Sequence, residues 1–239
     1  MTSAPINTTA ALATRRHVAL HLAHRWFAFL EAPGGDLETH LKIFHPQVRL
    51  SGHRGGHLFA RDHDSLMAWF AAVPDAISAH HIMHSVYADA DDGSGLLDMV
   101  VAYQAPGDTG VHGAIISYAT RIEFAPDGAR FVALDKTPIL PNGRPDYATS
   151  WATNRALARV HAELGRITDA DSPLRAALGG HVAQVFAHAA APEASPAYEA
   201  VITGSGCDSP NIRVLRLGLV DDIREPLPII AHMAPCAPT

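Results

Sequence analysis

The sequence has little of what several protein classes require. Only two of its 239 residues are cysteine, Cys207 and Cys236, and they lack the CxxC spacing of metal and redox sites. No apolar run is long enough for a membrane span. No cluster of lysine and arginine provides a face for phosphate backbones, and the formal net charge is -6. We therefore expect neither a membrane nor a nucleic-acid partner.

The N-terminus also lacks the basic stretch and apolar core of a signal peptide, so a cytoplasmic location is expected. What the chain does have is a globular composition, with 48% apolar and 18% charged residues. Its length suits one large domain, or a standard domain with a smaller attachment.

Three helices are predicted in the first third of the chain. In residues 12–31, apolar side chains recur every three or four positions, as expected for one face of a helix. Asp36 and Asp62 are suitable N-caps for two shorter helices, which Pro46 and Pro74 end. The loop between them, 51–57, is rich in glycine and histidine, and a short strand is predicted at 48–50.

The pattern then changes to that of β-strands. Four long strands are predicted, at 78–88, 96–104, 111–124 and 130–140. The segments between them contain Gly, Pro and Asp and are short enough for hairpins. An antiparallel meander is expected, and parallel α/β folds are disfavoured.

The chain after the meander is predicted to form a separate part. Proline and glycine residues at 138–145 indicate a boundary between a first domain, 10–141, and a C-terminal α/β extension, 146–239. The extension contains one predicted helix, 149–167, and several short strands, at 181–189, 198–203 and 212–220. Its role is unknown. Gly204-Ser205-Gly206-Cys207 lacks the lysine and the strand-helix context of a phosphate loop and is interpreted as a turn.

Two motifs in the meander carry a resemblance to a known superfamily. His-His-Ile-Met-His opens the first long strand at 80–84, and Tyr-Ala-Thr-Arg-Ile-Glu-Phe at 118–124 precedes Asp127-Gly128 and Arg130-Phe131. In this order, after three helices, they resemble the nuclear transport factor 2-like superfamily, and within it the SnoaL-like polyketide cyclases and scytalone dehydratase. The tryptophan often found after that Asp-Gly is Ala129 here. The Tyr-Asp pair of scytalone dehydratase has no counterpart around Leu30 and Glu31.

The resemblance implies an α+β fold in which a cone-shaped, curved antiparallel sheet packs against three N-terminal helices. It also implies a ligand cavity inside the cone and a homodimer. It does not imply one reaction, because the superfamily includes isomerases, cyclases, dehydratases, epoxide hydrolases and proteins that only bind partners.

Strand alternation predicts which side chains point into the cone. On the third long strand, the more apolar face carries His112, Ile116 and Tyr118, which we expect to contact a substrate together with Trp26. Tyr118 has a hydroxyl that can donate a hydrogen bond to a substrate oxygen.

On the last strand, Asp135 shares a face with Phe131, Ala133 and Thr137, so a carboxylate is predicted among apolar neighbours. Desolvation raises the pKa of such a group, and a histidine beside it would complete an acid-base pair.

On the first long strand the inward set is predicted to be His80, Ile82, His84 and Val86, with 81, 83, 85 and 87 as the alternative, because a one-residue slip exchanges the two faces. Asp135, His80 and His84 are accordingly the candidate catalytic residues.

The 16 histidines also raise the question of a metal site, which is not expected. His80 and His84 lie roughly 13 Å apart on an extended strand, too far to share an ion. His17, His21 and His24 are interpreted as a solvated stripe on the first helix. His53, His57 and His63 lie near one loop, but no carboxylate or cysteine spacing supports a site.

Two functions are left open. The first is a SnoaL-like lyase or isomerase without cofactor that uses a histidine and Asp135 for proton transfer on a small hydrophobic carbonyl or hydroxyl compound. The second is a non-catalytic ligand-binding or dimerisation module of the same fold, whose cone is filled by a metabolite or by side chains.

Overall fold

The computed structural model describes residues 8–31, 35–73, 78–108, 110–142, 151–166, 182–190, 197–204, 211–220 and 229–235. Its contacts divide the chain into two units, one from Leu22 to Asn154 and one that combines Met1–His21 with Arg155–Thr239. No helix among the described residues is both long and apolar enough to cross a membrane. Cys207 and Cys236 lie outside the described residues.

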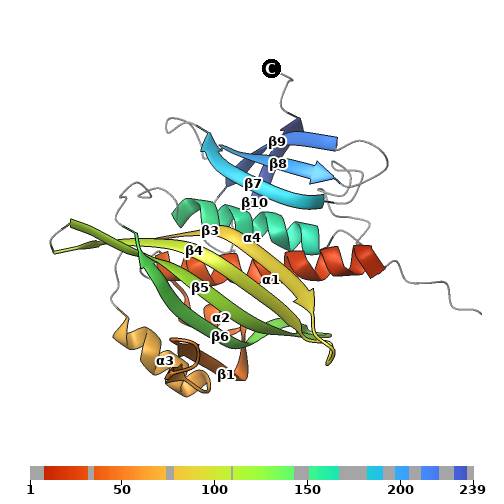
Figure 1. The fold of residues 1–239 in the computed structure, drawn as a ribbon. Coiled ribbons are helices and arrows are strands. Elements are labelled where there is room, and N and C mark those ends of the chain that lie inside the picture. Colours follow the sequence, from red (N-terminus) through yellow and green to blue (C-terminus); the bar gives the residue numbers. More distant parts are fainter. Residues whose placement is uncertain are drawn as a thin grey trace, which may run out of the picture. The chain divides into compact units, whose positions relative to one another are not determined.

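The unit from Leu22 to Asn154 is built on a curved sheet of six strands in the order β2-β1-β6-β5-β4-β3 (Figure 1). The strands are β1 (Phe44–Gly52), β2 (His57–Ala60), β3 (Ala79–Asp89), β4 (Gly95–Gly107), β5 (Gly110–Ala125) and β6 (Gly128–Pro141). The last four form the predicted antiparallel meander. β1 pairs with β6 in parallel, so the sheet is mixed. β1 extends into the predicted loop 51–57, and β2 begins at the last residue of that loop.

The three predicted helices are present: α1 (Thr8–Glu31), α2 (Leu37–Leu41) and α3 (His63–Ala72). Asp36 and Asp62 accept hydrogen bonds from the first turns of α2 and α3, as N-caps do. α2 ends earlier than predicted because Phe44 already belongs to β1, where it is buried in register with Phe131 of β6.

The interior of this unit is aromatic. Trp26 of α1 packs against Phe44 of β1 and against Trp69 and Phe70 of α3, with ring centroids 5.4 to 5.8 Å apart. The next residue of α1, Phe27, meets Tyr118 of β5 at 5.3 Å. α1 therefore fills the inner side of the sheet with large rings.

Two β-bulges change which side chains face inward. On β3, Ile82 pairs with Val101 and His84 with Val100, so Met83 is an extra residue. On β6, Phe131 pairs with Ile122 and Ala133 with Arg121, so Val132 is an extra residue. Beyond each bulge, the residues that strict alternation would place inward point outward, and those it would place outward point inward.

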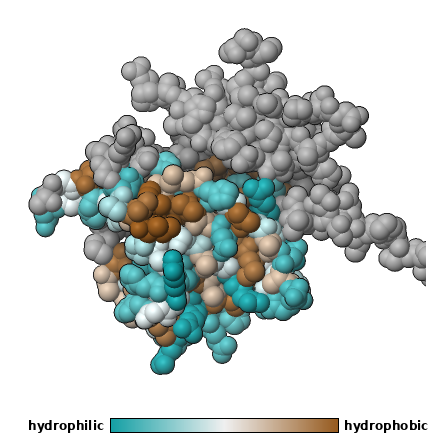
Figure 2. Space-filling view, in the orientation of Figure 1, coloured by the Kyte–Doolittle hydropathy of each residue, from teal (hydrophilic) through white to brown (hydrophobic). Residues whose placement is uncertain are grey.

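The outer side of the sheet carries exposed apolar residues among polar ones. Figure 2 shows a cluster of hydrophobic side chains on the visible face, surrounded by hydrophilic ones. Among the side chains that the structure describes, the most exposed large apolar ones are Met83, 63% exposed, and Leu140, Val86 and Ile139.

The second unit combines two helix segments with a four-stranded sheet. It contains α1 up to His21, α4 (Trp151–Gly165) from Arg155 onward, and the strands β7 (Val182–Ala190), β8 (Ala197–Gly204), β9 (Asn211–Val220) and β10 (Ile229–Pro235). The sheet is antiparallel, in the order β10-β9-β8-β7. The sequence predicted α4 and the first three strands but not β10.

The histidines of α1 are not the solvated stripe that the sequence predicted. Within the second unit, His17 is only 4% exposed, and its Nδ1 lies 3.0 Å from Nδ1 of His161 on α4. His21 Nδ1 lies 2.7 Å from the carbonyl oxygen of Ala158. His24, which belongs to the first unit, is buried as well.

Candidate functional site

A carboxyl group lies buried at the C-terminal end of α1, within the first unit. Glu31 is 0% exposed. Its Oε1 accepts a hydrogen bond from the backbone N–H of His80 at 2.5 Å and another from Nδ2 of Asn154 at 2.8 Å. The start of β3 is joined to the same helix end by Ser78, whose hydroxyl donates to the carbonyl of Leu30. The helix end and the strand start are therefore fixed to each other at Glu31.

Asn154 holds this arrangement together. Its Nδ2 donates to the carbonyl oxygen of His80 at 2.6 Å as well as to Glu31, so both of its N–H groups are used. Its Oδ1 lies 2.7 Å from Nδ1 of His24, which donates to it. Three segments far apart in sequence thus converge on one buried polar network.

The imidazole of His80 lies beside the carboxyl. It is 5% exposed and stacks on Phe27, with ring centroids 5.0 Å apart, while Tyr103 of β4 lies at the same distance on another side. His80 Nδ1 is 3.4 Å from Oε1 of Glu31 without the direction of a hydrogen bond. The two titratable groups are neighbours inside an aromatic enclosure.

Burial makes both groups neutral at pH 7. Desolvation raises the pKa of Glu31 to about 9, although the hydrogen bonds from His80 and Asn154 oppose it. The pKa of His80 is lowered to about 3, chiefly by desolvation and to a smaller extent by electrostatic repulsion from Lys136 and His81. The site thus pairs a protonated carboxyl with an uncharged imidazole.

The hydrogen bonds also indicate where the carboxyl proton resides. Oε1 of Glu31 accepts two hydrogen bonds, so the proton belongs on Oε2. Neither Oε2 of Glu31 nor Nδ1 of His80 has a hydrogen-bonding partner among the residues that the structure describes. A buried O–H and a buried imidazole nitrogen are therefore both available to a third group.

The expected substrate contacts lie on the inner side, with one exception. Trp26, Ile116 and Tyr118 are buried, and burial raises the pKa of the Tyr118 hydroxyl, which stays protonated. His112 is exposed near the start of β5, with its ring 6.2 Å from that of Tyr103. Contact of these four residues with a substrate remains a prediction.

His84 is not part of the enclosure. The bulge at Met83 turns His84 and Val86 outward, and both are exposed, whereas Ser85 and Tyr87 are half-buried. The predicted inward set thus holds for His80 and fails beyond the bulge.

Asp135 does not lie beside His80. The bulge at Val132 places Leu134 inward, in register with Thr120, and turns Asp135 to the other side, in register with the exposed Ala119. Asp135 and His80 are also separated by two strands, β4 and β5. The predicted pairing of these two residues is wrong.

Asp135 instead holds the loop between β1 and β2. Its carboxylate accepts hydrogen bonds from the backbone N–H groups of Arg54 and Gly55 and from the hydroxyls of Ser51 and Thr137. Partial burial alone would raise the pKa of Asp135, but these four hydrogen bonds outweigh it and lower the pKa. The loop needs this support because His53 and Arg54 both have positive φ angles, which non-glycine residues rarely adopt.

Asp135→Asn is expected to lower the free energy of unfolding by about 1–3 kcal/mol at pH 7, because an amide N–H would face donors that now bind a carboxylate oxygen. A group with a lowered pKa stabilises the fold at neutral pH and stops doing so as the pH falls below 3.8, the ordinary value. The difference from the wild type should therefore shrink in acid. Urea unfolding at pH 7 and pH 3 measures it, with the exposed Asp91→Asn as control. An equal loss at both pH values would contradict this role.

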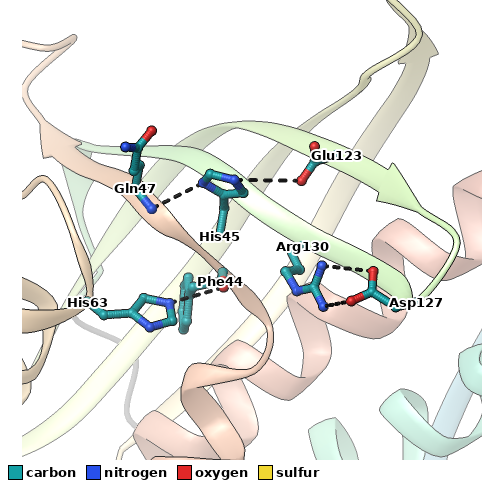
Figure 3. Close-up of polar contacts among 7 residues, drawn as sticks. All are labelled: Phe44, His45, Gln47, His63, Glu123, Asp127 and Arg130. Atoms are coloured by element: carbon teal, nitrogen blue, oxygen red, sulfur yellow. Dashed lines mark hydrogen bonds and ion pairs between the residues drawn. The ribbon is translucent and has the colours of Figure 1, made fainter.

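The histidines near the β1–β2 loop do not converge. His63, at the start of α3, has its Nε2 3.1 Å from the carbonyl oxygen of Phe44, and His45 lies toward Glu123 (Figure 3). His57 packs its ring on Phe59 at 4.5 Å. In the part of the chain that the structure describes, no group of three potential metal ligands comes together.

Sequence reasoning found His80 but missed its partners. Glu31 ends an amphipathic helix, where a glutamate is ordinarily solvated, and Asn154 lies 74 residues from His80 along the chain. The one sequence feature that could have indicated Glu31 is its position, at the helix end where scytalone dehydratase carries its Tyr-Asp pair. The structure shows that a carboxyl group is present there.

Comparison with known proteins adds information on fold alone. No family model matches the sequence, and no curated protein is similar to it. Solved structures do match. A proposed dehydratase from the NTF2-like family of Streptomyces avermitilis is 15% identical, with 52% of this chain and 95% of that chain covered and a TM-score of 0.44. An NTF2-like protein of unknown function in nutrient uptake from Rhodospirillum rubrum is 14% identical over 52% and 98% of the two chains, with a TM-score of 0.41.

The CaMKII hub of S. rosetta is 11% identical over 58% of this chain and all of that chain, with a TM-score of 0.41. In the present structure, three helices precede the four strands of the meander, and β1 and β2 lie between the second and third helices. The unit from Leu22 to Asn154 therefore has the α+β class that the sequence predicted, with a curved sheet, an antiparallel meander and three helices.

Proposed function

We propose that the protein is a lyase or isomerase without cofactor that moves a proton on a small hydrophobic carbonyl or hydroxyl compound. Glu31 is the proposed acid and His80 the proposed base. The observation that carries this proposal is the pair itself: a fully buried carboxyl group beside a buried imidazole, each with a polar atom that has no hydrogen-bonding partner among the described residues. Pairs of titratable groups whose pKa values are pushed in opposite directions are typical of acid-base sites.

In the proposed step, His80 takes a proton from the carbon next to a carbonyl group while Glu31 Oε2 gives its proton to the carbonyl oxygen. The product is an enol. Return of a proton to another carbon gives an isomer, and departure of a neighbouring hydroxyl as water gives dehydration. Phe27 and Tyr103 enclose His80, and their aromatic rings suit an apolar compound.

The test is exchange of carbon-bound hydrogen for deuterium in a panel of small hydrophobic ketones, followed by NMR. Glu31→Gln and His80→Asn are expected to slow exchange by about 10²–10⁴-fold. His84→Asn, on the exposed part of the same strand, is the matched control and should change nothing.

The pH profile provides a second criterion. The rate should fall above a pH of about 9, where Glu31 loses its proton, and below about 3, where His80 gains one. Exchange that survives both substitutions would contradict the proposal.

A second candidate function is a non-catalytic ligand-binding or dimerisation module. The observation that favours it is the filled interior, where Phe27 lies between His80 and Tyr118 and Trp26 is 1% exposed. The homodimer predicted from the sequence belongs to both candidates, and the exposed apolar residues of the sheet are compatible with it. A module without catalysis predicts no exchange with any ketone, in the wild type as in the variants.

A further inference from the structure

A positive charge lies inside the first unit, on the strand next to Tyr118. Lys136 of β6 is in register with Tyr118 of β5 and with Gly52 of β1, and the bulge at Val132 turns its side chain inward. Its Nζ lies 4.8 Å from the centre of the Trp69 ring and 4.9 Å from that of Phe59. The ammonium group is therefore held between two aromatic rings, at cation–π distance from both.

The backbone beside Lys136 is shaped to allow this enclosure. A Cβ atom on Gly52 would lie 2.6 Å from Cε2 of Phe59 and 2.9 Å from the carbonyl oxygen of Lys136. Only glycine lets the Phe59 ring approach β1 this closely. The ring of Phe59 also lies 6.4 Å from that of Trp69, so the two walls of the enclosure are neighbours.

No residue that the structure describes serves Lys136 as a counter-ion. Among the residues that the structure describes, its ammonium makes no ion pair or hydrogen bond, and its recorded contacts are the two rings. The adjacent Asp135 faces the other side and is occupied by four donors. Burial lowers the pKa of Lys136, and a half-buried cation without a partner is unfavourable. An anion placed beside the ammonium group would relieve this.

We propose that Lys136, with Phe59 and Trp69, is a subsite for a carboxylate group of the compound that binds in this unit. The inference rests on the proposed function and names its substrate class, a hydrophobic carboxylic acid. β6 and β3 are three strand spacings apart, about 14 Å between backbones, and the side chains of Lys136 and His80 shorten that gap. A molecule that reaches from Lys136 to His80 must take space that Phe27 and Tyr118 now fill.

The test uses the fact that the chain has two lysines, Lys136 and the exposed Lys42. In protein labelled with ¹³C at the lysine Cε, two signals are expected. Titration with phenylacetate should shift the Lys136 signal and leave the Lys42 signal in place, and the uncharged phenylacetamide should bind at least tenfold more weakly. Lys136→Met should weaken phenylacetate binding, followed through tryptophan fluorescence, by about tenfold or more, whereas Lys42→Met should not.

Equal binding of acid and amide, or a Lys136 signal that phenylacetate does not move in the wild type, would overturn the subsite. The wild-type titration needs no variant to fold. Because binding is measured without turnover, Glu31→Gln separates the two proposals. A Glu31→Gln variant that loses exchange and still binds phenylacetate supports both proposals. A wild type that binds phenylacetate but exchanges no hydrogen supports the subsite and refutes the acid-base function.

Discussion

Replacing Glu31 by Gln is expected to stabilise the protein, and to do so more strongly as the pH rises. The folded protein keeps this carboxyl protonated up to a pH of about 9, whereas the unfolded chain releases the proton near 4.5. Between these values the unfolded state binds fewer protons, so the wild type loses about 1.4 kcal/mol of stability per pH unit. Glutamine has the shape of a protonated glutamic acid and carries no such penalty.

The pKa shift of His80 changes folding stability in the opposite direction and over a different pH range. Its pKa is lowered from 6.5 to about 3, so the fold gains stability as the pH rises through that range and nothing further above it. Unfolding measured from pH 6.5 to 9 therefore isolates Glu31. The exposed Glu38→Gln is the control and should show no slope against the wild type.

An ion pair between Glu31 and His80 predicts the reverse result. Removal of one charge would leave the other buried without a partner, and Glu31→Gln would destabilise the protein by about 3–5 kcal/mol near neutral pH. Urea unfolding curves at several pH values separate the two states. A destabilised variant, or a difference that does not change with pH, would contradict the neutral pair.

Trp26→Ala is expected to lower the free energy of unfolding by about 3–5 kcal/mol. The indole is 1% exposed and meets Phe44, Trp69, Phe70 and His40, so truncation leaves a large cavity at the junction of α1, α3 and β1. Trp26→Phe should lower the free energy of unfolding by less than Trp26→Ala, because a phenyl ring keeps part of the aromatic contact.

Leu58→Ala is the matched control, because Leu58 is 46% exposed and its truncation should change stability by about 0.5 kcal/mol or less. Chemical denaturation with a probe of secondary structure measures all three variants, since Trp26 itself contributes to fluorescence. A loss below about 1 kcal/mol for Trp26→Ala would mean that the site collapses around the cavity and that Trp26 is not central to the core.

The helices and the meander follow from the sequence because their signals are local. Hydrophobic period, the caps at Asp36 and Asp62 and the Gly-containing turns all act over a few residues. The parallel pairing of β1 with β6 is not local. It places Phe44 in register with Phe131, and no sequence pattern within either strand predicts this pairing.

The inward faces were predictable only as far as each bulge. Strict alternation places His80, Tyr118 and Ile116 correctly but misplaces His84 and Asp135, because Met83 and Val132 each add a residue to one strand. Neither position has the glycine or proline that marks many irregular strands, so the sequence carries no visible sign of either bulge.

The polar network around Glu31 was beyond sequence reasoning for another reason. Buried polar groups are recognised by their partners, and the partners of Glu31 lie 49 and 123 residues away. The histidines of α1 illustrate the same limit. Their spacing was correctly seen as one face of a helix, but only α4 shows that the face is covered.

The protonation state of Glu31 tests the central claim most directly. ¹³C NMR of the glutamate side-chain carboxyl carbons, with the Glu31 signal assigned by its loss in Glu31→Gln, reports the titration of this one group. A neutral pair of Glu31 and His80 gives a midpoint near pH 9, with the His80 ring uncharged throughout the neutral range. A midpoint near 4.5, together with a protonated His80 at pH 7, would show an ion pair and contradict the proposed acid and base.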